Sequence, residues 1–218
     1  GRPLNSMYGY VADGLFTTNE QLLNSAEQQG KGLGRIRYRD LDGNGIINDD
    51  DRTWIGIPYP DFAYGLNINL EYKDFDFTMF WQGIGKVAIV NQLKYQTDFW
   101  SVDDIGSNKG SRLLNAWSPS NPNSTIPALT TIDTNAESRF STYFIENGSY
   151  LKLRNIQLGY SMPESILEKY TISKFRIYFG VQNLLTIASS NFTGVDPENA
   201  GFGYPLPLTS TLGFNITF

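Results

Sequence analysis

The sequence predicts an all-β protein made of antiparallel strands, and two observations carry that prediction. Apolar side chains occupy every second position over runs of about ten residues, which is the period of a strand with one apolar face. These runs are joined alternately by short turns and by long connections. The composition agrees, because 21 Gly, 13 Tyr and 14 Phe accompany only 18% charged residues. A helical soluble enzyme would carry more charge and fewer aromatic side chains.

The clearest strand pair begins at Phe62. Even positions from Phe62 to Tyr72 are apolar, whereas the odd positions between them are small or polar. After a tight turn at Lys73-Asp74 the apolar phase moves to the odd positions, as expected of a β-hairpin. The second strand of this hairpin is expected to continue as far as Val90.

Four further segments have an extended pattern. Three are strands at 150–161, 174–187 and 206–218, and a weaker one covers 7–16. In the first of these strands the apolar phase slips, which predicts a β-bulge near Arg154-Asn155. One helix is expected at 18–28, with Thr18 as its N-cap and Gly30 as its stop.

The connections between the strands differ strongly in length. The turn at Lys73-Asp74 and the connection 162–173 are short, while the longer connections are 17–61, 91–141 and 189–205. Alternation of long and short connections is typical of outer-membrane barrels, which have long extracellular loops and short periplasmic turns. The mean hydropathy of −0.30 agrees with such a barrel, because alternation hides its apolar band. The same strands would also build a soluble antiparallel sheet with one buried face.

The end of the chain favours the barrel over the soluble sheet. Residues 211–218 read Thr-Leu-Gly-Phe-Asn-Ile-Thr-Phe, with apolar side chains at alternate positions and a final Phe218. This segment resembles the β-signal by which bacterial outer-membrane barrels are recognised by their assembly machinery. With Phe218 on the periplasmic side, the three longer connections are expected to be extracellular. The residues expected to face lipid are Leu66, Ile68, Leu70, Phe77, Met79, Phe214 and Ile216.

A series of motifs follows in a defined order along most of the chain. Examples are Gly-Arg-Ile-Arg-Tyr-Arg-Asp at 34–40 and Trp-Ser-Pro-Ser-Asn-Pro at 117–122. The others lie at 8–16, 42–48, 51–52, 55–56, 60–65, 126–127, 148–160, 182–184 and 196–198. In this order the motifs resemble the C-terminal part of the SusC/RagA family of TonB-dependent outer-membrane transporters from Bacteroidetes.

The resemblance implies that residues 1–218 are the C-terminal segment of a plugged transmembrane β-barrel of about 22 strands. The plug domain and the other strands are expected outside this chain, and those strands must pair with its edges, because an open edge in lipid leaves backbone groups unpaired. The family imports oligosaccharides, or oligopeptides in some members, across the bacterial outer membrane. It draws energy from the TonB system and works with a SusD-like lipoprotein lid.

An acidic loop follows the extended segment 35–39. Its spacing matches an EF-hand calcium loop, with acidic or amide side chains at positions 1, 3, 5 and 12, a glycine at 6 and a carbonyl ligand at 7. The candidate ligands of a structural Ca²⁺ ion are Asp40, Asp42, Asn44, the carbonyl of Ile46, and Asp51. Asp51 replaces the usual Glu, which shortens its reach for bidentate binding. The alternative is an Asx-rich turn with solvated acids.

Composition removes several other classes of function. Cys and His are absent, which excludes disulfides, thiolate chemistry, His-ligated zinc and His-dependent catalytic triads. The net charge of −5 argues against a nucleic-acid partner. The paired acids Asp103-Asp104 and Asp49–Asp51 lie in predicted loops, so neither a glycosidase nor any catalytic residue is expected.

The main rival interpretation is a soluble, calcium-stabilised β-sheet adhesin or glycan-binding module. Four aromatic residues of the predicted loops bear on it, namely Tyr95, Phe99, Trp100 and Trp117. Such rings stack on sugars, but they also form interface belts or pack loops, and packing is favoured for Trp117.

Overall fold

The computed structural model describes residues 1–98, 108–130, 136–201 and 203–218. These residues form two compact units, each built from stretches that are separated along the chain. Unit 1 comprises 1–59, 88–147 and 193–203, and unit 2 comprises 60–87, 148–192 and 204–218. Phe99, Trp100 and Asp103-Asp104 lie outside the described residues.

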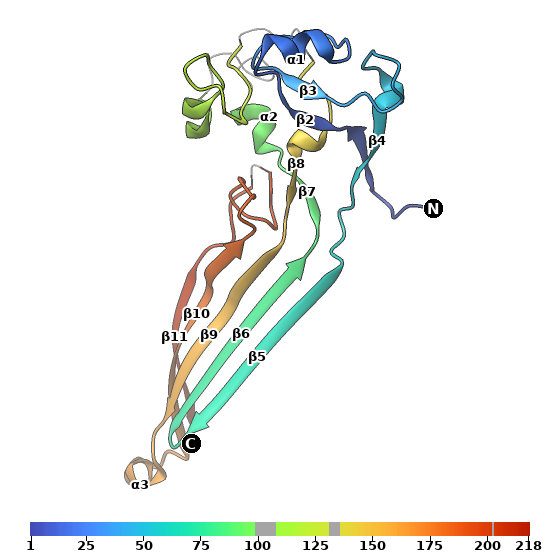
Figure 1. Cartoon of the computed structure of the whole chain (residues 1–218). Helices are drawn as coiled ribbons and strands as arrows, with labels where there is room; N and C mark the ends of the chain where they lie inside the picture. Colours follow the sequence, from blue (N-terminus) through green and yellow to red (C-terminus); the bar gives the residue numbers. More distant parts are fainter. Residues whose placement is uncertain (99–107, 131–135, 202) are drawn as a thin grey trace. The chain divides into compact units, whose positions relative to one another are not determined.

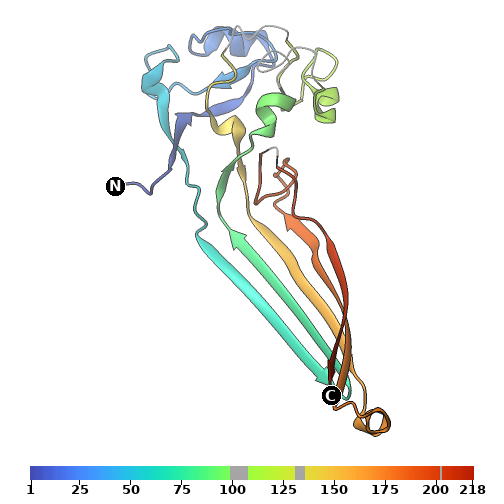
Figure 2. The same cartoon turned by 180° about the vertical axis from the view of Figure 1, so that it is seen from behind.

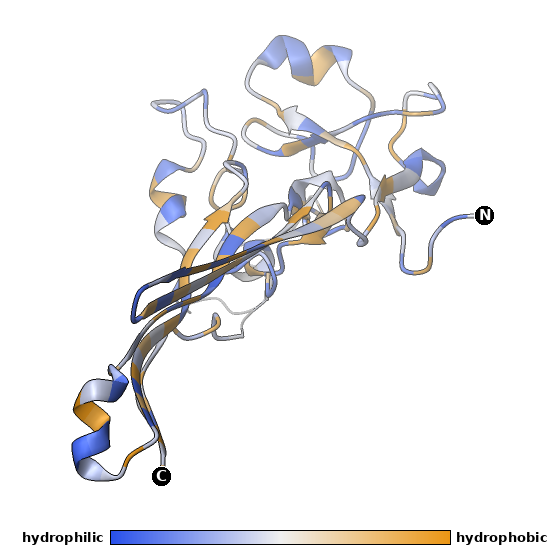
Figure 3. Cartoon of the chain, turned by 90° about the horizontal axis from the view of Figure 1, so that it is seen from below, coloured by the Kyte–Doolittle hydropathy of each residue, from blue (hydrophilic) through white to orange (hydrophobic). Residues whose placement is uncertain are grey.

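Unit 2 is a five-stranded antiparallel sheet with the strand order β11-β10-β9-β6-β5 (Figure 1). Its strands are β5 (Phe62–Tyr72), β6 (Phe75–Gly85), β9 (Tyr150–Ser161), β10 (Lys174–Ala188) and β11 (Thr209–Thr217). Figure 3 shows apolar and polar residues alternating along these ribbons. The antiparallel strands predicted from the period of two are therefore confirmed.

The predicted ends of two strands are wrong. β6 ends at Gly85 rather than near Val90, because Lys86 has a left-handed backbone with φ +55° that interrupts the strand. β11 begins at Thr209 rather than at Leu206, because Pro205 and Pro207 have no N–H to give to a ladder.

The predicted bulge is confirmed in the middle of β9. Phe80 of β6 is opposite Asn155, but Trp81 is opposite Leu153, so Arg154 is the extra residue. On the other side of β9, the register of β10 also shifts, and Asn183 there has φ +54°.

The two short connections of unit 2 differ in form. Lys73, with φ +56°, makes the tight turn between β5 and β6. The connection 162–173 holds α3 (Glu164–Leu167) and η4 (Glu168–Tyr170), and the buried side chain of Leu167 anchors it.

Unit 1 contains three two-stranded antiparallel sheets and several short helices (Figure 2). The strand pairs are β1 (Met7–Tyr10) with β4 (Arg52–Gly56), β2 (Ala12–Leu15) with β3 (Ile36–Tyr38), and β7 (Ala88–Val90) with β8 (Ile145–Asn147). The helices are α1 (Asn19–Asn24), η1 (Asp49–Asp51), α2 (Leu93–Thr97), η2 (Ser111–Asn115) and η3 (Thr142–Phe144). The sequence pattern indicated only the first of these helices.

The helix predicted at 18–28 is shorter than expected. Thr18 is its N-cap, as predicted, and forms a capping box with Gln21. The helix nevertheless ends at Asn24, because Glu27 makes a β-bridge with Ile46 instead of a further helical turn. Gly30 has φ +65° and lies in the turn beyond, so it is not the helix stop.

Two aromatic residues of the predicted loops, Tyr95 and Trp117, pack against the core of unit 1. Its buried side chains are Leu15, Ile36, Tyr38, Ile47 and Phe144. Tyr95 stacks on Phe144 with ring centroids 3.7 Å apart, and burial raises the pKa of Tyr95 to about 12. Trp117 packs against the same core, so the packing interpretation is confirmed for this residue. Tyr95 is not the exposed stacking platform that the sequence allowed.

Within the described ranges, no helix has the length and apolar character needed to cross a membrane.

Candidate functional site

The register of the unit 2 sheet gathers its apolar side chains on one face. Residues directly opposite each other in neighbouring antiparallel strands point to the same side of a sheet. One apolar row crosses the whole sheet and runs Leu70, Phe77, Leu158, Phe179, Leu212. The seven residues predicted to face lipid all lie on this face. Leu212 is 72% exposed and Leu70 is 59% exposed, so the chain itself does not cover this face.

The other face of the sheet is polar. A row next to the apolar one runs Asn69, Thr78, Gln157, Gly180, Thr211. A continuous apolar face that the chain leaves exposed is rare on a soluble domain. One apolar and one polar face, on strands of this length, is the construction of a transmembrane barrel wall.

An ion pair crosses the polar face over the middle strand. Arg176 of β10 donates from Nε to Asp76 Oδ1 at 2.8 Å, and its Nη2 donates to Asp76 Oδ2 at 2.5 Å. Strand β9 lies between the two partners and has Gly159 directly opposite Asp76. A Cβ atom at position 159 would collide with both the carboxylate and the guanidinium. The glycine is therefore what lets the ion pair bridge three strands.

The same polar face has a second glycine contact near the end of the chain. The Arg176 guanidinium lies over the Tyr178 ring, 5.0 Å from its centroid. The Tyr178 ring in turn covers Gly213 of β11, where a Cβ would collide with it. This contact gives a physical role to the glycine in the signal-like segment 211–218.

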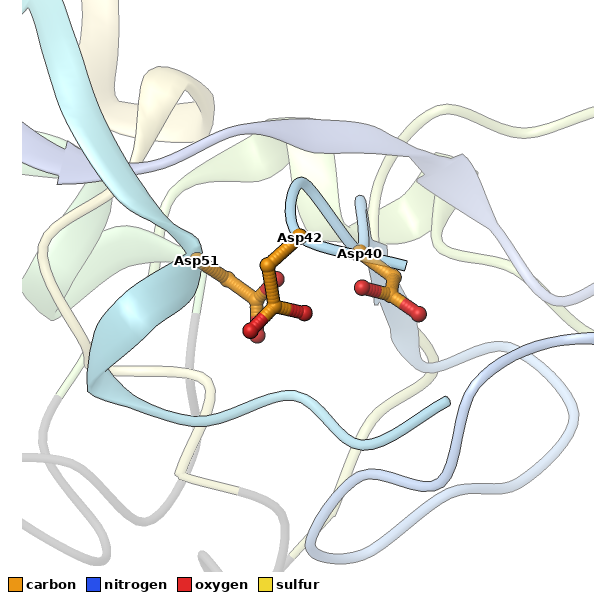
Figure 4. Close-up of side chains that lie close together, drawn as sticks. All are labelled: Asp40, Asp42 and Asp51. Carbon is orange, nitrogen blue, oxygen red and sulfur yellow. The ribbon is translucent and has the colours of Figure 1, made fainter. Parts of the chain in front are cut away.

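The acidic loop brings three of its five predicted ligands together. One carboxylate oxygen from each of Asp40, Asp42 and Asp51 lies within 4.8 Å of the others (Figure 4). Asp51 is fully buried, whereas Asp42 is exposed. Asn44 turns its amide toward Asp42, with Nδ2 donating to Asp42 Oδ2 at 2.8 Å. Ile46 forms the bridge to Glu27, and its side chain is 57% exposed.

Backbone N–H groups preorganise the carboxylates of this loop. Asp40 accepts hydrogen bonds from the N–H groups of Gly43 and Gly45, at 2.7 and 2.8 Å. These bonds, above all the one from Gly45, lower the pKa of Asp40. Asp51 accepts from Leu41 and Asn48, at 2.6 and 2.8 Å, so its side chain closes the loop.

The loop is fixed to the core of unit 1 at its middle. Glu27 donates its N–H to the Gly45 carbonyl at 2.8 Å and accepts from Ile47 N–H at 2.7 Å. The Ile47 side chain is buried in the core. The arrangement can hold a hard cation among oxygen ligands, and the lowered pKa of Asp40 keeps its carboxylate charged to lower pH than that of an isolated aspartate.

A buried polar network around Glu146 was not predicted from the sequence. Its Oε1 accepts from Lys94 Nζ at 2.8 Å and from Thr193 Oγ1 at 2.6 Å. Its Oε2 accepts from Asn91 Nδ2 at 3.0 Å and from the Thr193 N–H at 2.9 Å. Burial alone would raise the pKa of Glu146, but the bonds from Lys94 and Thr193 outweigh it and lower that pKa. The network joins two of the three stretches that make up unit 1, namely 88–147 and 193–203.

The nearby carboxyl group of Asp98 has its pKa shifted in the opposite direction. Burial raises the pKa of Asp98, although Tyr143 and Arg112 partly oppose it. Tyr143 donates to Asp98 Oδ2 at 2.7 Å, and Arg112 Nε lies 3.3 Å from Asp98 Oδ1. Burial also raises the pKa of Tyr143, so its hydroxyl stays protonated and remains a donor.

We expect Glu146→Gln to release the segment that follows Thr193. The substitution leaves Lys94 buried without its charged partner, and breaking such a pair costs about 3–5 kcal/mol. Hydrogen exchange of the Thr193 amide in the full-length protein should then be roughly a hundredfold faster. In the unsubstituted protein the pKa of Glu146 is lower in the folded state than in the unfolded state, where it is near 4.3. The stabilisation by the Glu146 network is therefore fully present above about pH 4.3, and it is lost as the pH falls through the folded pKa.

The control for this prediction is Glu164→Gln, since Glu164 lies exposed on α3. It should leave the Thr193 amide as protected as before at every pH. Unchanged protection in Glu146→Gln would show that the network does not hold this segment.

Comparisons with known proteins agree with the barrel-wall interpretation. No family model matches the chain. TonB-dependent receptor P3 of Formosa agariphila is 34% identical over all of the chain, which spans 22% of that receptor. TonB-dependent receptor SusC of Bacteroides thetaiotaomicron is 30% identical over 96% of the chain, which spans 20% of SusC. The chain therefore covers about a fifth of the length of these relatives.

Solved structures share the fold. The RagAB peptide transporter matches all of the chain with a TM-score of 0.76 and 24% identity, over 23% of the matched chain. The closed-closed state of the RagAB peptide importer matches with a TM-score of 0.75 and 25% identity, again over 23% of that chain. The chain belongs to the SusC/RagA family of TonB-dependent receptors, which are proteins of the bacterial outer membrane. Its strands are part of a β-barrel, and its relatives are receptors and transporters rather than enzymes.

Proposed function

We propose that the chain forms part of the wall and of the extracellular loops of a TonB-dependent outer-membrane importer. The sheet with one continuous apolar face and one polar face is the observation that carries this proposal. A barrel wall needs this construction, because it has lipid on one side and a polar lumen on the other. The whole protein would have about 22 strands around a plug domain, with residues 1–218 as its C-terminal segment.

The partners follow from this placement. A SusD-like lipoprotein lid would meet the connections 17–61, 91–141 and 189–205, and the TonB system would supply the energy. The sequence contains no Gly-Lys-Ser or Gly-Lys-Thr nucleotide loop, in agreement with an external energy source. The proposed cargo is an oligosaccharide. An oligopeptide is the second candidate, because RagAB, whose fold the chain shares, is a peptide transporter.

Uptake by whole cells tests this proposal. Cells that carry the full-length receptor should take up a labelled oligosaccharide, and should fail to do so when the receptor gene or TonB function is removed. A labelled oligopeptide, offered in the same assay, decides between the two cargo classes. Undiminished uptake without TonB would overturn the energy coupling, and a structure of the complex with nothing over the three long connections would overturn the lid.

We further propose that the acidic loop holds a structural Ca²⁺ ion with Asp40, Asp42, Asn44, the Ile46 carbonyl and Asp51 as ligands. The convergence of three carboxylates within 4.8 Å supports it. So does the anchored bridge between Glu27 and Ile46, which keeps the loop closed without help from a partner loop. Calcium is plentiful outside the cell, so a site with a Kd of about 10⁻⁴–10⁻³ M would be filled there.

Asp42→Asn should weaken calcium binding by about tenfold or more, because it removes one of the charges that set affinity in such loops. Isothermal titration of the full-length receptor with CaCl₂ measures the change. Asp50→Asn is the matched control, since Asp50 lies on the same loop, is exposed and is outside the converging set. Equal affinities for both variants, or no calcium-dependent heat in the unsubstituted protein, would contradict the site.

A further inference from the structure

A shallow hollow lies at the end of the sheet where β5 begins and β6 ends. Its volume is about 350 Å³, and its lining includes the side chains of Phe62, Tyr64, Leu151 and Ile187. All four side chains belong to the apolar face of the sheet. Tyr64 is opposite Gly83, which is opposite Leu151, and Leu151 is opposite Ile187.

Two glycines leave room for the aromatic rings of the hollow to lie against the sheet. The Phe62 ring lies against Gly85 and the Tyr64 ring against Gly83, and a Cβ at either glycine would collide with the ring. The two rings also stack on each other, with centroids 5.9 Å apart. Because the rings lie along the sheet instead of standing away from it, they leave an apolar surface onto which a hydrocarbon chain can lie.

The rim of the hollow carries an exposed cation. Lys86 follows the last residue of β6, and its N–H donates to Ser149 Oγ at 2.9 Å, which fixes the backbone at this point. Its side chain is 75% exposed and lies 3.7 Å from Asp61, whose side chain is 64% exposed. An ion pair this long and this exposed contributes little, so the ammonium remains available to a second anion.

We propose that the hollow binds a membrane lipid with a phosphate headgroup, its acyl chain on the apolar lining and its phosphate on Lys86. This inference rests on the proposed function, because it needs the apolar face to lie in the outer membrane. The hollow lies where the strands end, which is where a bilayer changes from hydrocarbon to headgroups. Lysine side chains at that depth reach the headgroups while their stems stay on apolar surface. Charge complementarity thus selects a phosphate-bearing lipid.

Free phosphate is not the proposed ligand. A single exposed lysine with a carboxylate 3.7 Å away offers little binding to a small anion in water. A lipid gains in addition from the apolar contact with the hollow, which free phosphate lacks. The proposal therefore requires that both parts of the ligand be present on one molecule.

Native mass spectrometry of the full-length receptor, purified in a maltoside detergent, tests the site. The probes are a palmitoyl-oleoyl phosphatidylglycerol, a galactosyl diacylglycerol with similar chains but no phosphate, and inorganic phosphate. Retention of the phosphatidylglycerol should fall about fivefold in Lys86→Gln, as expected for loss of one basic residue near the headgroups. It should rise in Asp61→Asn, because the competing carboxylate is removed.

Lys73→Gln is the matched control, since Lys73 is an exposed lysine at the opposite end of the same hairpin. It should retain the lipid as the unsubstituted receptor does. Equal retention in Lys86→Gln, equal retention of the galactolipid, or binding of inorganic phosphate alone would overturn the lipid site while leaving the importer intact. A receptor that retains no lipid and does not fractionate with the outer membrane would instead overturn the proposed function.

Discussion

Ile68→Arg in the full-length receptor should destabilise the folded barrel by about 2–4 kcal/mol, whereas Asn67→Arg should cost much less. Ile68 lies midway along β5 on the apolar face, opposite Met79. An arginine there would place a charge near the middle of the hydrocarbon layer. Asn67 is its neighbour on the polar face, where an added charge stays in a wet environment.

Urea unfolding of the receptor in lipid vesicles, followed by the loss of its resistance to SDS, gives the two free energies. Outer-membrane levels of both variants in cells provide a second measurement. Similar losses at positions 67 and 68 would contradict the assignment of the two faces.

Gly159→Ala is the second substitution with a large expected effect. The added Cβ would collide with both partners of the Asp76–Arg176 ion pair, which must then separate. Inserting a methyl group into a packed position typically costs about 1–3 kcal/mol, and separating a partly exposed ion pair on the polar face adds up to about 1 kcal/mol. We expect lower unfolding midpoints in vesicles and reduced insertion of the receptor in cells.

Gly180→Ala is the control for this prediction. Gly180 lies on the same polar face, and the nearest atoms to a Cβ there are 3.7 Å away, which is ordinary contact. In a receptor that already carries Asp76→Ala and Arg176→Ala, adding Gly159→Ala should lower the unfolding midpoint less than it does in the unsubstituted receptor. If Gly159→Ala and Gly180→Ala behave alike, the ion pair does not depend on the glycine.

Strands could be predicted from the sequence where the alternation of apolar and polar residues decided which face each side chain occupies. In β5 the alternation gave both strand ends, and the phase slip in β9 gave the bulge at Arg154. The spacing of the acidic loop likewise brought Asp40, Asp42 and Asp51 together. In each case the information is local, because the side chains that matter are neighbours along the chain.

Features that depend on distant contacts escaped prediction. The helix beginning at Asn19 stopped early because Glu27 pairs with Ile46, a residue that no local pattern connects to it. No local pattern indicated a role for Glu146, since its partners Asn91 and Thr193 are 55 and 47 residues away. The role of Gly159 could not be predicted either, because it depends on the strand register, which places this glycine beneath an ion pair whose partners are 100 residues apart.

The assembly of unit 1 from three separated stretches has a consequence for the order in which the molecule matures. Thr193 supplies two of the hydrogen bonds to the Glu146 carboxylate, and it comes after β10 in the chain. In a polypeptide synthesised from its N-terminus, the Glu146 carboxylate lacks these two hydrogen bonds until Thr193 has been made. Contacts between such distant residues form slowly. We therefore expect unit 1 to reach its final hydrogen bonding only after the stretch that begins at residue 193 has joined the two earlier stretches.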